Sequence, residues 1–224
     1  MISMKYGDDN LNVNYQKLLD EKLSEIKKTG ARPRLLLHSC CAPCSSHVLE
    51  YLSSFFDITV YFYNPNIHPE YEYRKRAIEQ REFIENFPPA KGVLFAEGEY
   101  EAERFFELSK GLEDEPEKGA RCTICFKMRL EKAAQYALEY DFDYFTTTLS
   151  ISPHKDAALL NELGEKTGKE AGVEYLHSDF KKKNGYKRST ELSSEYGLYR
   201  QDYCGCVFSK LESDKRNSMN NKSE

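Results

Sequence analysis

The fold of this chain is decided in one stretch, Leu35-Leu36-Leu37-His38-Ser39-Cys40-Cys41-Ala42-Pro43-Cys44. It opens with a short continuous apolar run, which is typical of a β-strand, and the run stops at Ser39. Residues 45–56, which follow directly, have the apolar spacing of a helix. The first three cysteines therefore lie where a strand turns into a helix.

Outward from this stretch, strands and helices alternate along the chain. Short apolar, β-branched or aromatic runs predict strands at residues 35–38, 58–63, 93–96, 144–148 and 173–177. Apolar residues at helical spacing predict helices at residues 15–28, 45–56, 70–87, 100–110, 122–140, 155–166 and 189–199. This alternation predicts an α/β fold, a three-layer domain with a parallel sheet. Ligands of such sheets gather at the carboxyl ends of the strands, where we expect the cysteine groups to converge.

Composition and charge bound the kind of protein. The chain has 224 residues, of which 40% are hydrophobic, and this suits one globular domain. We predict a helical lead-in at residues 1–30, a single α/β metallo-domain at residues 31–212 and a disordered polar tail at residues 213–224. No apolar segment approaches the roughly 18 residues of a membrane span, so we expect a cytoplasmic protein without a membrane partner. The net charge of −5 leaves only local basic patches, at residues 74–76 and 181–188.

All seven cysteines fall into three tight groups. They are Cys40, Cys41 and Cys44; Cys122 and Cys125; and Cys204 and Cys206. Thiols one to three residues apart can direct their sulfurs to a common centre, so all seven are candidate metal ligands. Four thiolates match an iron–sulfur cluster or a structural zinc equally by ligand type. However, zinc sites usually take two C-x-x-C pairs about 15 to 20 residues apart, and the surplus thiols favour redox chemistry.

Five segments carry a resemblance to a known family. They are residues 38–44, 63–71, 121–130, 147–155 and 199–209. Together they resemble the epoxyqueuosine reductases of the QueH type, which act in the last step of queuosine synthesis in tRNA. The resemblance implies a fold similar to the adenine-nucleotide α-hydrolase-like (HUP) group. In this chain cysteines replace the glycine-rich phosphate loop of that group, so we reject an ATP pyrophosphatase activity.

The resemblance also implies a reaction. The family reduces an epoxide on the cyclopentane ring of the tRNA-borne base to an alkene, which consumes two electrons and two protons and releases water. Our hypothesis assigns a [4Fe-4S] cluster to Cys40, Cys41, Cys122 and Cys125. Two options then remain for Cys44, Cys204 and Cys206, namely a second iron that binds the epoxide oxygen or a reversible disulfide that passes electrons inward.

Protons and tRNA contacts need further residues. The candidate proton donors flank the motifs and are His38, His68, His154, Asp156, Asp202 and Tyr203. Of these we assign His154 and Tyr203 to the catalytic set, although a histidine before a loop is more often structural. The candidate phosphate contacts are basic and comprise Lys181, Lys182, Lys183, Lys187, Arg188 and Arg74, with Arg76 beside them. The candidate stacking partners for an extruded base are Tyr63, Tyr71, Tyr186 and Tyr203.

Two other classes of protein remain open. A structural-zinc nucleic-acid-binding module predicts a colourless protein that holds zinc. A thiol–disulfide oxidoreductase would use Cys122 and Cys125, whose position at a helix start lowers thiol pKa values, and would not need Cys40 or Cys41. No flavin or nicotinamide motif is visible, so we expect an external electron donor in either redox case.

Overall fold

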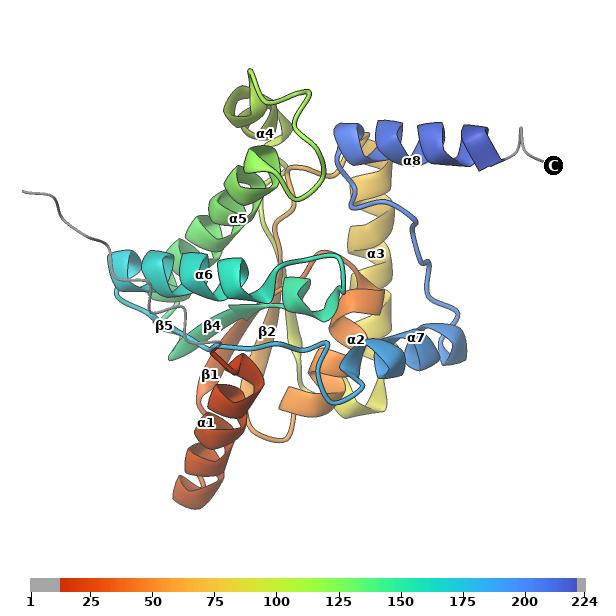
Figure 1. The fold of residues 1–224 in the computed structure, drawn as a ribbon. Helices are drawn as coiled ribbons and strands as arrows, with labels where there is room; N and C mark the ends of the chain where they lie inside the picture. Colours follow the sequence, from red (N-terminus) through yellow and green to blue (C-terminus); the bar gives the residue numbers. More distant parts are fainter. Residues whose placement is uncertain (1–12, 221–224) are drawn as a thin grey trace, which may run out of the picture.

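A five-stranded, all-parallel sheet forms the centre of the protein (Figure 1). The computed structural model describes residues 13–220. The strands are β1 (Arg34–His38), β2 (Asp57–Phe62), β3 (Leu94–Glu97), β4 (Tyr144–Thr147) and β5 (Glu174–Tyr175). They lie side by side in the order β3-β2-β1-β4-β5. The predicted α/β class and parallel sheet are confirmed.

Eight α-helices and two short 3-10 helices precede, connect or follow the strands within the described residues. The α-helices are α1 (Tyr15–Thr29), α2 (Ala42–Leu52), α3 (Glu70–Asn86), α4 (Ala102–Ser109), α5 (Ala120–Glu139), α6 (Ala157–Ala171), α7 (Gly185–Glu195) and α8 (Val207–Asn220). The 3-10 helices are η1 (Pro88–Ala90) and η2 (Thr148–Ile151). The predicted helices and strands agree with these within a few residues at their ends, except for α8 and the 3-10 helices, which the sequence patterns did not predict.

The helices pack on both faces of the sheet, and the alternation of side chains along β1 shows how. Leu35 and Leu37 are buried against α1, α2, α3 and α7, whereas Leu36 points to the other face and packs against α5 and α6. The same alternation places Ile58 and Val60 of β2 on the first face. The central strands are therefore covered on both sides, which explains the nearly continuous apolar sequence of β1, whereas Leu94 of the edge strand β3 is exposed (Figure 1).

The order of the strands creates one position where connections leave in opposite directions. From β1 the chain runs through α2 to β2 on one side, while β4 pairs with β1 on the other side, with His38 opposite Thr147. Such a switch point leaves a crevice beyond the carboxyl ends of the two central strands. The turn after β1 carries Cys40 and Cys41, so the fold places these thiols at the crevice.

The C-terminal segment differs from its prediction. Residues 213–220, which we expect to be disordered, continue the helix that begins at Val207, while residues 221–224 lie outside the described residues. Two contacts that the polar composition does not indicate hold this segment. Phe208 packs on a buried cluster, and Ser213 donates a hydrogen bond to Asp202 at 3.1 Å. No helix in the described part of the chain is long and apolar enough to cross a membrane.

Candidate functional site: a thiol-lined cavity

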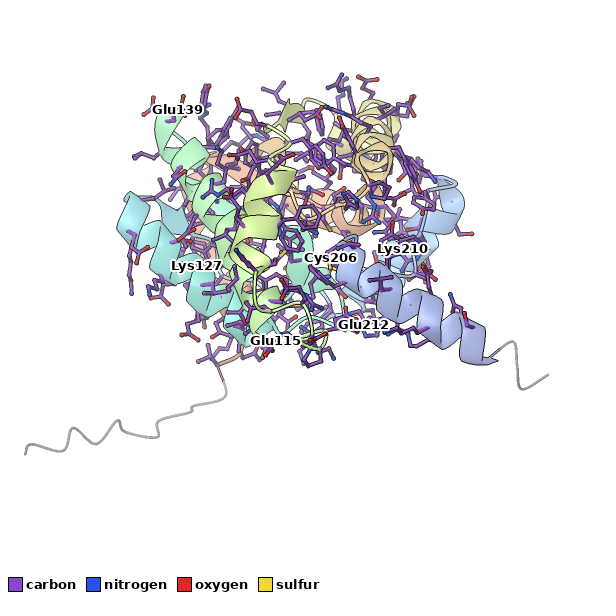
Figure 2. The ribbon with its side chains drawn as sticks, turned by 90° about the horizontal axis from the view of Figure 1, so that it is seen from above. Glu115, Lys127, Glu139, Cys206, Lys210 and Glu212 are labelled. Carbon is purple, nitrogen blue, oxygen red and sulfur yellow. The ribbon has the colours of Figure 1, made fainter. Side chains whose placement is uncertain are left out.

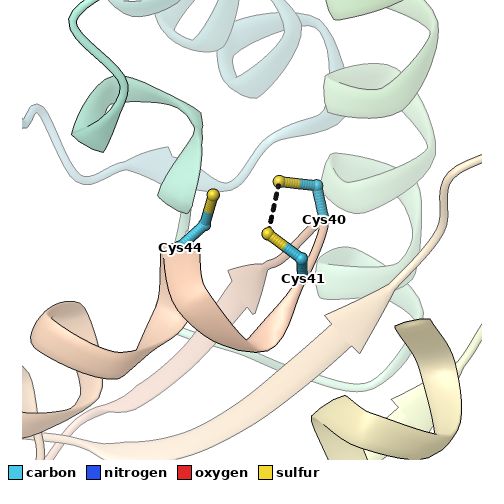
Figure 3. A group of neighbouring side chains, drawn as sticks. All are labelled: Cys40, Cys41 and Cys44. Atoms are coloured by element: carbon cyan, nitrogen blue, oxygen red, sulfur yellow. Dashed lines mark hydrogen bonds between the residues drawn. The ribbon is translucent and has the colours of Figure 1, made fainter. Parts of the chain in front are cut away.

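The first thiol group consists of Cys40, Cys41 and Cys44, and the turn from β1 into α2 gathers its sulfurs (Figure 3). All three Sγ atoms lie within 4.8 Å of one another, and those of Cys40 and Cys41 are 3.8 Å apart. Cys41 is the N-cap of α2 and Pro43 lies in its first turn, where proline favours the start of a helix. The group therefore sits at a helix N-terminus, where the helix dipole favours negative charge.

The three sulfurs hold their protons unequally. Hydrogen bonds from Cys41 and Cys44 lower the pKa of the Cys40 thiol well below its usual value. The hydrogen bond to Cys40 in turn raises the pKa of Cys41 to about 12. One thiolate shared by two thiols is a suitable starting point for binding a metal, which displaces the remaining protons.

Buried polar groups fix the backbone that carries this group. Ser39 donates a hydrogen bond to Gln80 Oε1 at 2.8 Å, and Asn64 Nδ2 donates one to the Ser39 carbonyl oxygen at 2.8 Å. His38 Nδ1 lies 2.8 Å from Thr147 Oγ1, and burial lowers the pKa of His38 to about 4. His38 is thus a neutral structural group between two strands, and its geometry does not favour the role of proton donor.

The second thiol group consists of Cys122, Cys125, Cys204 and Cys206, and it lines a small neighbouring cavity of about 20 Å³. The first two come from the start of α5, and the last two from the loop before α8. Figure 2 shows Cys206 where α8 meets the body of the molecule. Its sulfur accepts a hydrogen bond from the Ser209 N–H at 3.4 Å, which satisfies a free amide at the start of α8. Burial raises the pKa of Cys125 to about 12.

Gly205 allows the loop between Cys204 and Cys206 to fold against the core. Its φ of +119° lies in a region that favours glycine. A Cβ at this position would lie 3.0 Å from Arg76 Nη1. The Gly205 carbonyl oxygen accepts a hydrogen bond from the His68 N–H at 2.9 Å, so the loop is tied to the segment before α3.

A larger cavity of about 470 Å³ joins the two thiol groups. All three members of the first thiol group line it, and Cys204 lines both this cavity and the small one. The structure thus brings together sulfurs from all three groups of the sequence. A volume of this size suits a small ligand or a single extruded nucleotide.

The predicted proton donors divide between this cavity and structural positions. His154 and Tyr203 line the cavity, and burial raises the pKa of Tyr203 to about 12, which keeps its hydroxyl protonated. Asp202 also lines it, but hydrogen bonds from Ser213 and Asn217 lower its pKa. Two others have structural positions: Asp156 is the N-cap of α6, and His68 packs edge-on against Phe106.

The predicted basic residues lie mostly in ion pairs. Five of the six have carboxylate partners, in the pairs Lys181–Asp179, Lys183–Asp20, Lys187–Glu191, Arg188–Glu50 and Arg74–Glu70. The exception is Lys182, which forms no ion pair with a described residue. Among the predicted stacking residues, Tyr186 and Tyr203 line the large cavity, whereas the Tyr63 hydroxyl donates a hydrogen bond to Glu101 at 2.8 Å.

Three cations in the large cavity escaped the sequence reasoning. Lys155, Arg200 and Arg216 line it, and none forms an ion pair with a residue that the structure describes. Burial would lower the pKa of Lys155, but the negative field of nearby cysteines, with Cys204 first, raises it. These residues lie singly in the sequence, so no charge run marks them. The available signal was that Lys155 and Arg200 lie in two of the segments that carry the family resemblance.

The donor set fits a metal that prefers sulfur. A separation of 3.8 Å between two sulfurs corresponds to one edge of a tetrahedron whose metal–sulfur bonds are about 2.3 Å. Sulfur is the ligand of zinc and of iron–sulfur centres, and not of magnesium or calcium. The fold and the site together define a cysteine-rich α/β protein with a candidate metal centre next to a ligand-sized cavity.

Comparison with known proteins makes the assignment specific. The family model described as epoxyqueuosine reductase QueH matches residues 35–212. The chain is 48% identical over 207 residues to the epoxyqueuosine reductase QueH of Staphylococcus epidermidis, covering 91% of this chain and 87% of that protein. The protein of the same name from Thermotoga maritima is 36% identical over 184 residues, covering 80% and 91%. The chain belongs to the QueH family of epoxyqueuosine reductases, which are oxidoreductases.

Proposed function

We propose that this protein reduces epoxyqueuosine to queuosine in tRNA. The observation that carries the proposal is a cavity of about 470 Å³ beside the switch point of the sheet, which is lined by four cysteines from two distant parts of the chain. Family membership supplies the reaction, and the cavity supplies a place where an epoxide-bearing base can meet redox-active sulfur. The strand order supports a fold of the adenine-nucleotide α-hydrolase-like group.

For the cofactor we propose a [4Fe-4S] cluster on Cys40, Cys41, Cys122 and Cys125. Cys122 packs with Cys40, Cys41 and Cys44 in one apolar cluster around Phe126 and Leu149, which supports its place in this set, while Cys125, one turn further along α5, packs beside Cys206. When bound, such a cluster would supply electrons one at a time, and a second iron nearby would polarise the epoxide C–O bond. Cys44 and Cys204 face the open cavity, where they can hold that iron or form a redox-active pair with Cys206.

The remaining residues of the cavity supply binding and protons. The Lys155 ammonium faces the same thiols, and the Tyr203 hydroxyl stays protonated at neutral pH. Both can donate to an oxygen that gains negative charge as the epoxide opens. His154 lines the same wall and is the third candidate donor. Electrons come from an external donor in this proposal.

For tRNA we propose that the unpaired cations contact the phosphates first. A cation already paired with a carboxylate must give up that partner, whereas Arg200 and Arg216 at the cavity need not. Arg200 also lies 5.7 Å from the ring of Tyr186, which places a charge beside an aromatic surface suited to a nucleobase. The paired lysines of residues 181–183 remain candidates for weaker, longer-range attraction.

This difference can be measured with an anticodon stem–loop. Binding should be followed by fluorescence anisotropy over a range of salt concentrations for Arg200→Ala and for Lys183→Ala as the matched control. Loss of one phosphate contact lowers the slope of log affinity against log salt by about 1, and we expect this only for Arg200→Ala. Equal slopes for both variants would contradict the assignment.

The function itself is tested by anaerobic purification, metal and sulfide analysis, and an assay with epoxyqueuosine-containing tRNA. We expect iron near four or five equivalents, acid-labile sulfide and a band near roughly 400 nm that dithionite bleaches. Zinc without sulfide would favour the binding module instead. The thiol–disulfide alternative is disfavoured because burial raises the pKa of both Cys122 and Cys125, whereas attacking thiols need a low pKa.

A further inference from the structure

Three arginines are almost completely buried, and one differs from the other two in its charge partners. Arg76 pairs with Glu72, with Nε and Oε1 2.7 Å apart. Arg121 pairs with Glu212 at 3.4 Å. Arg129 is 1% exposed, and no carboxylate of the described residues lies within ion-pair distance of it. A buried charge without a counter-charge costs several kcal/mol, so its retention requires a reason.

Arg129 contacts the segments that carry the thiols. Its Nε donates to the Cys125 carbonyl oxygen at 3.2 Å and its Nη1 to Asn64 Oδ1 at 3.4 Å, while Nη2 is buried without a hydrogen-bond partner. Asn64 in turn donates a hydrogen bond from Nδ2 to the carbonyl oxygen of Ser39, the residue before Cys40. The guanidinium therefore links the segments of the two thiol groups, and its Nη2 amino group has no hydrogen-bond partner.

Metal binding deprotonates the remaining thiols, so further negative charge is added near Arg129 together with the cofactor. We propose that Arg129 is the counter-ion of the metal centre: it neutralises the bound thiolates and raises the reduction potential of the centre. This inference rests on the proposed function. A positive charge and an N–H donor near sulfur both favour the more negative, reduced state. Arg129 is thus a positioning and tuning residue rather than a catalytic one.

The proposal predicts opposite effects in the metal-free and the loaded protein. In Arg129→Met, the apoprotein should melt at the same temperature as the wild type or higher, because an uncompensated buried charge is gone. The loaded variant should lose iron to a chelator faster than the wild type, and its midpoint potential, followed by electron paramagnetic resonance, should be more negative. Arg129→Lys should restore most of the potential. Arg121→Met is the control, and it should destabilise both forms alike, because it leaves Glu212 without its buried partner.

Two results would overturn the inference. One is a midpoint potential and iron retention in Arg129→Met equal to those of the wild type. The other is an equal loss of stability in both forms, which indicates a purely structural role. If Arg129→Met does not fold, Arg129→Gln takes its place against Arg129→Lys. Wild-type protein that binds no iron would refute the proposed cluster instead, and the inference is then decided by whether Arg129→Met speeds zinc release.

Discussion

The two thiol groups line adjoining cavities but are made in different ways. Cys40, Cys41 and Cys44 come from one turn, and a strand, a helix start and three buried hydrogen bonds hold it in place. Cys122, Cys125, Cys204 and Cys206 are assembled from α5 and from a loop far along the chain. The first group is therefore a local product of the sheet, whereas the second depends on long-range contacts.

This difference predicts that metal affinity and catalytic turnover depend on different cysteines. Ligands on a rigid turn or at the start of a long helix are pre-organised, so metal affinity should depend mainly on Cys40 and Cys41 together with Cys122 and Cys125. Ligands on a loop near the surface can adjust, which suits groups that meet a substrate or exchange electrons. Substitutions in the two groups should therefore affect metal content and turnover to different extents.

The largest effect is expected in the first group. Cys41→Ser should remove iron, colour and turnover together, with activity falling by more than about 100-fold, since even residues that only support metal ligands cost 10- to 100-fold. Iron content, the absorption spectrum and the tRNA assay measure this. Ser46→Ala on the same helix, whose hydroxyl bonds only the Pro43 carbonyl, is the matched control. Retained iron in Cys41→Ser would contradict the assignment of Cys41 as a cluster ligand.

A substitution in the second group should affect turnover without affecting the cluster absorbance. Cys204→Ser should keep most of the cluster absorbance and abolish turnover, because Cys204 faces the large cavity and is not assigned to the cluster. Anaerobic spectra and the tRNA assay on one preparation decide this. Loss of the whole cluster would show that Cys204 is a cluster ligand and that our division of the thiols is incorrect.

The first group was also the easier one to predict from sequence. An apolar run that ends in closely spaced cysteines indicates both the strand and the position of its thiols, and the structure places them accordingly. The sequence patterns also predicted every strand. The spacing also grouped Cys44 with Cys40 and Cys41, and its sulfur lies with theirs, although our cluster hypothesis assigns Cys44 to the second site.

The groups that sequence reasoning missed owe their roles to burial and pairing. Residues 181–183 form a conspicuous basic run, yet two of these three lysines are held by carboxylates. Arg129 lies in an ordinary amphipathic helix and becomes unusual only because no described carboxylate reaches it. Charge counts along a sequence cannot show which cations are free, since the partners come from distant elements.

A smaller effect is expected from the loop that carries the second group. Gly205→Ala should destabilise the protein by about 1 to 3 kcal/mol, because the φ of +119° is strained for alanine and the Cβ would contact Arg76 and Ile67. Gly172→Ala is the control, since it has a positive φ of +83° but open space around its Cβ. Chemical denaturation measures both. Turnover should fall in Gly205→Ala with iron largely retained, and a parallel loss of iron would contradict the separation of Cys204 and Cys206 from the cluster.

The smallest effect is expected from a hydrogen bond that ties the chain before Cys204 to α3. The Tyr199 N–H donates to Glu79 Oε1 at 2.6 Å, while Oε2 is buried and unpartnered. Burial raises the pKa of Glu79 above its ordinary 4.5, and the Tyr199 hydrogen bond offsets only part of the rise. The folded protein thus holds this proton more tightly than the unfolded chain. The associated stability is present below pH 4.5 and is lost as the pH rises through the raised pKa.

Glu79→Gln keeps an acceptor for Tyr199 and cannot ionise. Relative to the wild type, the variant should therefore gain stability between about pH 4 and about pH 7, by about 1 kcal/mol or less. Urea denaturation of both metal-free proteins at the two pH values tests this, because the titration of all shared groups cancels in the difference. A difference that does not change with pH would mean that Glu79 ionises freely, so that this tether of the second group is exposed to water rather than buried.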